Sequence, residues 1–196
     1  MRTPKIFLST FLALCTLFSF IPTSSEAQRH KRHKTVIVVK RPAHKVVVRR
    51  AHVRYAAMPR WGAVVAVRPF NTIFITGRRG IGYHYTNGIF YQQRNNAYVV
   101  VRPSRGIRIR VIPAGFRLIN VGPRRYYYYY GTYYVKAAND YVVIDPPKGA
   151  VVDALPDGYE IKTIDGNEYY YLDGVYYAEV DAPEFSDGVG YEVVEF

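Results

Sequence analysis

The sequence predicts an all-β fold of antiparallel short-strand repeats, three units of about 43 residues each, preceded by a signal peptide and a basic arm. Gly88, Gly131 and Gly174 are spaced 43 residues apart, and each lies inside an aromatic run. Proline and glycine turn signals divide the chain into short segments, and no window sustains the apolar period of an amphipathic helix. Short strands joined by tight turns are therefore expected throughout the repeats.

Residues 1–27 are predicted to be a secretory signal peptide. A positive start precedes an almost unbroken apolar run at residues 6–21, and small residues lead to a cleavage site between Ala27 and Gln28. A membrane anchor is the alternative, but this run is short for a transmembrane helix. Lipidation at Cys15 is disfavoured because Leu14 stands where a small residue is needed. We expect an exported protein in the periplasm, at the cell surface or outside the cell, with no transmembrane span or thiol in the mature chain.

Residues 28–58 are predicted to be a basic arm. Residues 28–125 contain 22 lysines and arginines and no acidic residue, whereas residues 126–196 contain 3 lysines and 14 acidic residues. This asymmetry indicates an anionic partner for the first half, or pairing between the halves, within the chain or head to tail. The expected anions are envelope polymers or membrane headgroups rather than a specific nucleic acid. The candidate contacts to an anionic partner are Arg29, Lys31, Arg32, Lys34, Lys40, Arg41, Lys45, Arg49 and Arg50.

Three repeat units follow, at residues 59–101, 102–144 and 145–196, and the third carries an insertion at residues 181–188. Each unit opens with a proline turn and has a second proline turn ten residues later, as at Pro103 and Pro113. The second turn ends in glycine in units two and three and in Asn71 in unit one, and asparagine tolerates the left-handed conformation that such a turn requires. Each unit is expected to form four or five short strands, in separate barrels, one continuous sheet or a sandwich.

The tyrosine-rich segment at residues 126–134 is the middle copy of the repeated aromatic strand. Alternate residues of a strand face the same side, so Tyr126 and Tyr128 are expected on one face and Tyr127 on the other. These tyrosines either pack a core with one face, or present an aromatic platform to a sugar ring or to another protein. Positions that vary between units are the better candidates for an exposed aromatic surface: Tyr127, Tyr129 and Tyr130.

Aligned positions in units two and three carry opposite charges. If like strands of these units lie side by side, cross-strand ion pairs are expected. The pairs are Arg110–Asp153, Arg117–Glu160 and Arg102–Asp145.

The residues that could carry chemistry form no recognised motif. His30 and His33 lie three residues apart, but the neighbouring cations disfavour a bound divalent ion. Asp165 begins a fragment of a calcium loop, which lacks the alternating oxygen ligands and suits a hairpin turn equally well. His84 is expected to be an ordinary strand residue. We therefore expect no catalytic residue, no metal and no cofactor, with a hydrolase that has no visible motif as the enzymatic alternative.

Residues 146–178, PPKGAVVDALPDGYEIKTIDGNEYYYLDGVYYA, resemble the domain of unknown function 6515 group, an uncharacterised Tyr-rich repeat family of exported bacterial proteins. The elements that carry the resemblance are a P-x-G, an L-P-x-G-Y turn and a Y-Y-Y-x-x-G-x-Y-Y strand pair. It covers residues 103–178 well and is weaker in unit one, where Asn71 and Thr72 replace Gly-Tyr. The resemblance implies an exported protein of the bacterial envelope, and it implies no activity.

The sequence thus predicts a non-catalytic, exported, envelope-associated β-repeat protein with a structural or assembly role. Its expected partners are an envelope polymer or protein, or the protein itself. The alternative is a binding module for an anionic glycan or phosphate polymer, acting through the basic arm and exposed tyrosines.

Overall fold

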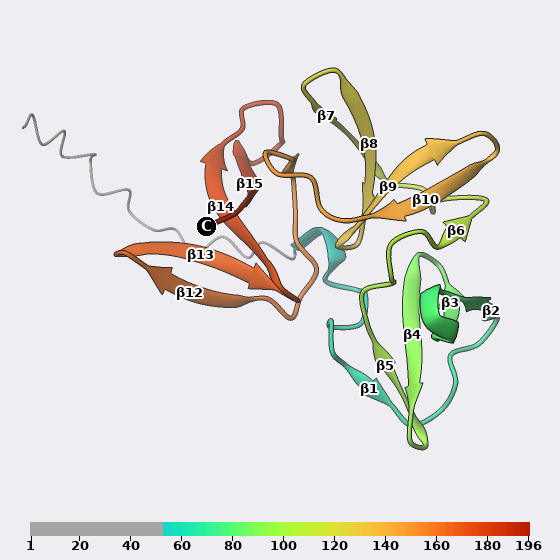
Figure 1. The fold of residues 1–196 in the computed structure, drawn as a ribbon. Helices are drawn as coiled ribbons and strands as arrows, with labels where there is room; N and C mark the ends of the chain where they lie inside the picture. The colour runs from blue at the N-terminus through green and yellow to red at the C-terminus, as the bar shows by residue number, and fades with distance from the viewer. Residues whose placement is uncertain (1–52) are drawn as a thin grey trace, which may run out of the picture. The chain divides into compact units, whose positions relative to one another are not determined.

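The computed structural model describes residues 53–196, and these residues form three separate five-stranded antiparallel sheets (Figure 1). The predicted all-β class and repeat are confirmed. The first sheet contains β1 (Val64–Val65), β2 (Ile73–Thr76), β3 (Gly82–Thr86), β4 (Ile89–Arg94) and β5 (Ala97–Val100). The second contains β6 (Arg108–Ile109), β7 (Arg117–Val121), β8 (Arg124–Tyr129), β9 (Thr132–Ala137) and β10 (Asp140–Ile144). The third contains β11 (Val151–Val152), β12 (Glu160–Ile164), β13 (Asn167–Leu172), β14 (Val175–Asp181) and β15 (Val189–Val194).

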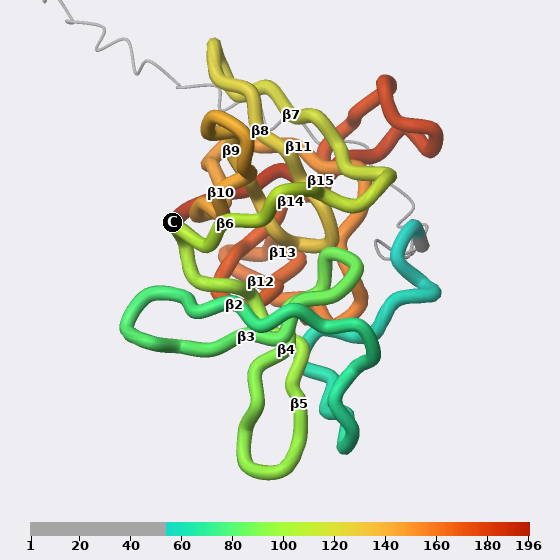
Figure 2. Tube along the Cα trace, turned by 90° about the vertical axis from the view of Figure 1, so that its right-hand side faces the viewer, coloured from blue at the N-terminus to red at the C-terminus, as the bar shows by residue number. Residues whose placement is uncertain are grey.

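Each sheet has the same strand order, in which the short first strand pairs with the fifth and strands two to five form a meander. The hairpins within the meander are visible in the side view, where β4 and β5 form a long green loop (Figure 2). The first strand is fastened by a repeated pair of backbone hydrogen bonds. In unit two, Gly106 N donates to Val143 O and Val143 N donates to Ile107 O, both at 2.8 Å. Each unit therefore closes a sheet of its own.

The repeated glycines are the second residues of two-residue hairpin turns. Asn87-Gly88, Tyr130-Gly131 and Asp173-Gly174 each have positive φ at both residues. This is the pattern of a type I′ turn, whose twist matches that of the flanking strands. The aromatic runs are therefore antiparallel strand pairs that reverse at these glycines, β3–β4, β8–β9 and β13–β14.

The insertion predicted in unit three lies in the connection between β14 and β15. This connection spans residues 182–188, whereas β9 and β10 are joined by residues 138–139 alone. It is folded on itself, because Ala182 N donates to Gly188 O and Phe185 N donates to Ala182 O, both at 3.0 Å. The extra residues therefore extend a hairpin and leave the sheet order unchanged.

The folded region begins before the predicted boundary at Pro59. The turn η1 (Val53–Tyr55) places Tyr55 in a hydrophobic cluster with residues of all three units, and Met58 packs against the same cluster. The signal peptide, the Ala27–Gln28 cleavage site and the candidate cations from Arg29 to Arg50 lie outside the described residues. Within residues 53–196, no helix is long and apolar enough to cross a membrane.

The cross-strand charge pairs expected between units two and three are wrong, because like strands do not pair across separate sheets. Opposite charges still meet, at other positions. Arg117 pairs with Asp153 at 2.6 Å rather than with Glu160. Arg102 pairs with Asp173 at 3.2 Å, and Asp145 pairs with Arg105 at 3.1 Å. The charge split is therefore partly structural, through contacts that the alignment of repeats does not predict.

The Gly131 turn gives a test of the packing between units. A Cβ atom at Gly131 would lie 2.6 Å from the Trp61 ring, whereas one at Gly166 would meet no atom of the described residues within 4 Å. Both glycines have positive φ, so alanine at either site costs about 1–2 kcal/mol in the left-handed region. Gly131→Ala should cost about 1–3 kcal/mol more, through overpacking. Urea unfolding of both variants measures the difference, and equal losses would contradict the close contact.

Candidate functional site

The tyrosines of β8 and β9 are mostly interior. Tyr126 and Tyr128 are buried on one face of β8, as their alternation predicted, and Tyr127 and Tyr129 on the other face are half-buried. Tyr130 is only 2 % exposed, so the expectation that it belongs to an exposed aromatic surface is wrong. Sequence variation between units singled this residue out. Its variation reflects a packing role that unit two alone requires.

Units one and two are joined by a hydrophobic interface. From unit one, Tyr83 and Phe90 enter a buried cluster, and the half-buried Tyr85 packs against it. Unit two contributes five buried side chains, namely Ile107, Ile109, Ile112, Tyr134 and Val143. We call the tyrosine and phenylalanine side chains of the third and fourth strands of each sheet (β3–β4, β8–β9 and β13–β14) the aromatic face of that unit. The side chains that follow the opening turn of the next unit, such as Ile107, Ile109 and Ile112, are called its aliphatic edge.

The same interface recurs between units two and three, 43 residues further along the chain. Tyr126 and Tyr133 are the counterparts of Tyr83 and Phe90, and both are buried. Their partners from unit three include the counterparts of the five residues above, Ala150, Val152, Leu155, Tyr177 and Val193. Val193 lies 50 residues after Val143 because the insertion intervenes. Each buried position of the first interface thus has a buried counterpart in the second.

Polar contacts repeat with the packing. Tyr85 Oη donates to Val111 O at 3.5 Å, and Tyr128 Oη donates to Ala154 O at 2.8 Å. Val111 and Ala154 are counterparts, each two residues before the proline of the second turn. The hairpin turns also contact the next unit in the same way. A Cβ atom at Gly88 would lie 2.9 Å from Pro113 Cγ, and one at Gly131 would lie 3.2 Å from Pro156 Cγ. The two proline turns therefore act as docking points for the preceding unit.

The turn residue Tyr130 fastens the N-terminal segment to this framework. Its ring lies 5.5 Å from that of Tyr55 and 6.1 Å from that of Trp61. Its amide donates to Tyr55 Oη at 3.2 Å, and its hydroxyl donates to Pro59 O. A bulky residue at φ 45° is strained by roughly 1–3 kcal/mol. These contacts offset that strain, which explains why a tyrosine stands where the other units have Asn87 and Asp173.

Burial keeps these phenols neutral. It raises the pKa of Tyr55 to about 12, against the smaller opposing effect of the Arg54 charge. Burial also raises the pKa values of Tyr128 and Tyr133 well above the usual value, and neighbouring tyrosines add to the effect. Proton transfer from such phenols near neutral pH is unfavourable, so these side chains act by packing, and Tyr55 and Tyr128 also form hydrogen bonds.

Asp153 connects three parts of the chain. Its side chain is 8 % exposed and lies 2.5 Å from Arg54 Nη1 and 2.6 Å from Arg117 Nε. Arg54 precedes the first unit, Arg117 lies in β7 of the second, and Asp153 follows β11 of the third. A buried carboxylate with two guanidinium partners is well compensated for its loss of water. Asp153 is therefore the main polar link of the folded region.

Two residues that the sequence analysis weighed for chemistry, His84 and Asp165, lie in a strand and in a hairpin turn. His84 lies in β3 between the rings of Phe74 and Tyr98, at 5.3 and 5.1 Å. Burial lowers the pKa of His84, and the charge of Arg68 lowers it further. Asp165 and Gly166 form the positive-φ turn between β12 and β13. His30 and His33 lie outside the described residues.

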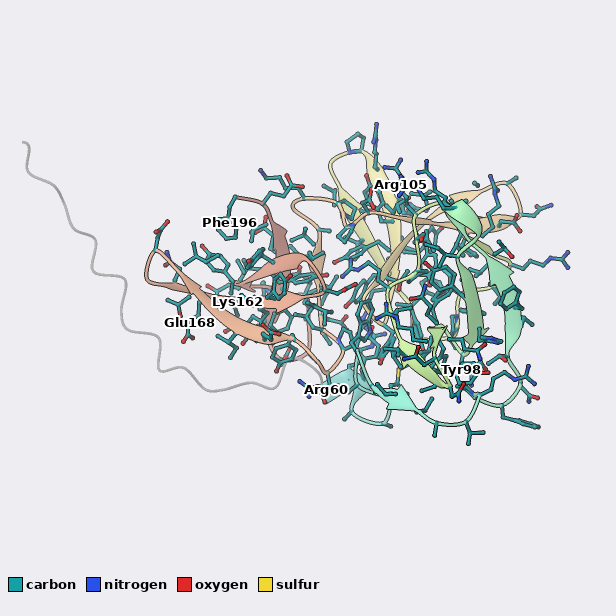
Figure 3. All side chains as sticks on the ribbon, turned by 60° about the horizontal axis from the view of Figure 1, so that its bottom comes forward. Arg60, Tyr98, Arg105, Lys162, Glu168 and Phe196 are labelled. Carbon is teal, nitrogen blue, oxygen red and sulfur yellow. The ribbon has the colours of Figure 1, made fainter. Side chains whose placement is uncertain are left out.

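A basic cleft of about 700 Å³ lies beside the second sheet. Arg105, Arg124, Arg125 and Tyr126 are among its lining residues, and Figure 3 labels Arg105. Arg105 forms an exposed ion pair with Asp145. Neither Arg124 nor Arg125 pairs with a carboxylate in the part of the chain that the structure describes, which leaves both guanidinium groups available to an anion.

Sequence reasoning found the aromatic faces but missed their partners. The aliphatic edge consists of isolated Ile, Val and Ala residues among turn signals, so its residue composition does not distinguish it from other parts of the repeats. The 43-residue shift that aligned the tyrosines also aligns Ile107 with Ala150 and Ile109 with Val152. Applied to apolar positions, that shift would have found the edge. Tyr55 precedes the repeats, and Trp61 stands where the other units have Arg105 and Lys148, so the repeat pattern gave no signal for their packing.

A family model described as "Family of unknown function (DUF6515)" matches residues 36–196. No curated protein and no solved structure matches the chain.

The link at Asp153 gives a test. Asp153→Asn should lower the free energy of unfolding by about 3 kcal/mol, because two arginines then lose a buried partner. Asp145→Asn is the matched control, since its pair with Arg105 is exposed and is worth about 0–1 kcal/mol. Urea unfolding at low and high salt measures both losses. Similar small losses in the two variants would show that Asp153 does not link the units.

The buried tyrosines give a pH test. Folding raises the pKa of a buried tyrosine above its value in the unfolded chain, which is about 10. The neutral phenol therefore contributes its full stabilisation below about pH 10, and this contribution is lost as the pH rises through the higher pKa of the folded state. For Tyr55, with a pKa of about 12, the loss is on the order of 3 kcal/mol. The urea midpoint should therefore hold up to about pH 9 and fall above about pH 10. Tyr55→Phe should fall less steeply, and a parallel fall in both proteins would contradict a role for Tyr55.

Proposed function

The chain belongs to DUF6515, a family of unknown function, and we propose that it is a non-catalytic structural or assembly protein of the bacterial envelope. The observation that carries the proposal is the aromatic interface that the chain uses twice. Tyrosine is the most distinctive component of this sequence, and tyrosines of all three units take part in the two interfaces between units. Such a chain is suited to building a rigid, repetitive body.

Export is part of the proposal and rests on the N-terminal sequence. The positive start, the apolar run and the small residues before Gln28 are typical of a secretory signal peptide. The periplasm, the cell surface and the extracellular space are all compatible with it. A folded region without cysteine suits an oxidising compartment, because it has no thiol to oxidise.

The basic cleft favours a second candidate function, the binding of an anionic glycan or phosphate polymer. Arg124 and Arg125 lie at its wall beside Tyr126, and arginine binds phosphate and carboxylate groups through two parallel hydrogen bonds. The arm cations from Arg29 to Arg50 would add a salt-dependent attraction that does not depend on the details of the polymer. The half-buried Tyr127 and Tyr129 are the tyrosines predicted for an aromatic contact that can still reach a partner.

Co-sedimentation with envelope fractions separates the two functions. The mature chain, residues 28–196, is compared with a chain that begins at residue 53, which spares Tyr55 and Met58 because both pack against the core. A structural role predicts retention of both proteins, with weak dependence on salt. Polymer binding predicts retention that requires the arm and falls by a factor of about 10³ or more between low and moderate salt if six or more phosphates are contacted.

The cleft has its own control in the same assay. Arg124→Ser with Arg125→Ser should leave retention unchanged if the role is structural, and should weaken it if the cleft binds the polymer. Arg78→Ser with Arg79→Ser removes the same charge from unit one. Absence of both proteins from every envelope fraction would refute an envelope role altogether.

A further inference from the structure

The basic cleft beside the second sheet has an apolar floor. Val135 of β9 and Val142 and Ile144 of β10 line the cleft, and all three side chains are half-buried. Val135 pairs directly with Val142, and Ile144 follows two residues later, so the three side chains lie on one face of the sheet. We call them the cleft floor. The cleft volume of about 700 Å³ is within the range of about 300–1,000 Å³ that is typical of ligand sites.

The cations that line this cleft are specific to unit two. Asp145 offsets the charge of Arg105, which leaves Arg124 and Arg125 as the lining cations without a carboxylate partner in residues 53–196. An apolar floor beside unpaired guanidinium groups is complementary to a ligand that joins an apolar group to an anion. The other units have neutral or acidic residues in place of the two arginines, namely Ile81 and Gly82 in unit one and Asn167 and Glu168 in unit three.

The equivalent position of unit one shows which groups fit there. A second cleft, of about 480 Å³, lies at this position, and unit three contributes Leu172 and Asp173 to its lining. Leu172 is buried, and the Asp173 carboxylate lies 3.2 Å from Arg102 Nε. An apolar side chain and a carboxylate are thus neighbours at this position of the repeat. The lining residues from unit one include the counterparts of Tyr126 and of the cleft floor, namely Tyr83, Gln92, Val99 and Val101.

Unit three also has an apolar group at the equivalent position. Tyr169 is the counterpart of Tyr126, and the ring of Phe196 lies 4.9 Å from the Tyr169 ring. Side chains of the protein itself therefore lie at this position in units one and three. The larger cleft of unit two has room for an apolar group from another molecule.

We propose that the cleft of unit two binds an anionic lipid, with an alkyl segment on the cleft floor and the anionic headgroup on Arg124 and Arg125. This inference rests on the anion-binding function proposed above for the same cleft, and it names the class of ligand. Each guanidinium group can donate two parallel hydrogen bonds to a phosphate or carboxylate. The alkyl segment gains stability because it leaves water for the cleft floor.

The cleft favours a lipid over an acidic peptide for two reasons. First, β9 lies between β8 and β10, and β10 lies between β9 and β6, so the backbone groups under the cleft floor are engaged in the sheet (Figure 1). A peptide laid on this floor would lose water from its own amides without a replacement, whereas an alkyl chain has no polar group to desolvate.

Second, the anchor that holds the peptide in unit one is absent from unit two. Arg102 donates to Leu172 O at 3.0 Å and to the Asp173 carboxylate at 3.2 Å. Asp145 is the counterpart of Arg102, and an aspartate cannot donate to a carbonyl or attract a carboxylate. The cleft of unit two therefore keeps the apolar floor but takes its cations from β8.

Calorimetric titration of the mature chain, residues 28–196, with alkyl phosphates tests the proposal. The probes are inorganic phosphate, butyl phosphate and octyl phosphate, each below the concentration at which it forms micelles. Octyl phosphate should bind at least about tenfold more tightly than butyl phosphate, because four more methylene groups leave water. Inorganic phosphate should bind more weakly than either. Equal affinities for the three probes would overturn the proposal and would leave a plain anion site.

Two variants separate the headgroup site from the floor. Arg124→Ser with Arg125→Ser should weaken the binding of both alkyl phosphates at least about tenfold. Val135→Gln should reduce the advantage of octyl over butyl phosphate at least about threefold. Unit one carries Gln92 at the position of Val135, so this sheet accommodates glutamine there.

Matched controls make the same changes elsewhere. Leu118→Gln alters the opposite face of the second sheet, because Leu118 pairs with Tyr127, which alternates with Tyr126 along β8. Arg78→Ser with Arg79→Ser removes two cations from unit one. Both controls should bind octyl phosphate like the parent protein, and unchanged binding by both cleft variants would overturn the proposal.

Methyl NMR of the parent protein gives a test that does not depend on any variant. Octyl phosphate should shift the methyl signals of Val135, Val142 and Ile144 more than those of the exposed Val111 and Leu118. Shifts confined to residues outside the cleft would contradict the assigned site.

The nature of the ligand is tested with a peptide and with vesicles. The peptide Tyr-Leu-Asp-Gly, which copies residues 171–174, should not displace octyl phosphate, and displacement would assign the cleft to an acidic peptide instead. Vesicles of phosphatidylcholine should retain the chain at high salt, where the attraction of the arm is screened, only when they contain phosphatidylglycerol. This retention should require Arg124 and Arg125. Binding of envelope polymer without any effect of alkyl length would refute the lipid and leave the anion-binding function intact.

Discussion

The packing of tyrosine rings against the aliphatic edge of the next unit is the interaction on which the rest of this structure depends. A single five-stranded sheet of about 43 residues is too small to bury both of its faces. The chain solves this by docking, and each large side chain that becomes fully buried contributes about 1.5–3 kcal/mol. Tyr128, Tyr133 and Tyr177 reach complete burial only because two units meet over them. Without the docking, the tyrosine-rich strands would expose their rings to water.

Features that look exceptional in isolation follow from this docking. Glycine is required at positions 88 and 131 because the turn needs positive φ and because a proline ring of the next unit lies against it. Tyr130 accepts a strained backbone because Tyr55, Pro59 and Trp61 surround its side chain. The polar link at Asp153 joins the segment before unit one to units two and three.

Much of this organisation was predictable from the sequence, and the limits have definite causes. Strand alternation placed Tyr126 and Tyr128 on one face of β8, since side chains alternate in any strand whatever its neighbours are, and the structure showed that this face is the interior one. The exposure of Tyr130 was predicted wrongly, because burial depends on what packs around a residue, and that partner comes from residues 75 positions earlier. The basic cleft was not predicted either, because Arg105 lies in the turn before β6 whereas Arg124 and Arg125 lie in β8, and the fold alone brings them together.

The sequence by itself determined the repeat, the all-β class, the turn positions and the separation of charge along the chain, because each of these depends on residues that are close in sequence or related by a constant spacing. Only the tertiary structure decided that the units close three separate sheets, that Arg117 meets Asp153 and not Glu160, and that Tyr130 is buried. Those features depend on how one unit approaches another. That approach is set by the shape of the packed surfaces, which a one-dimensional spacing does not encode.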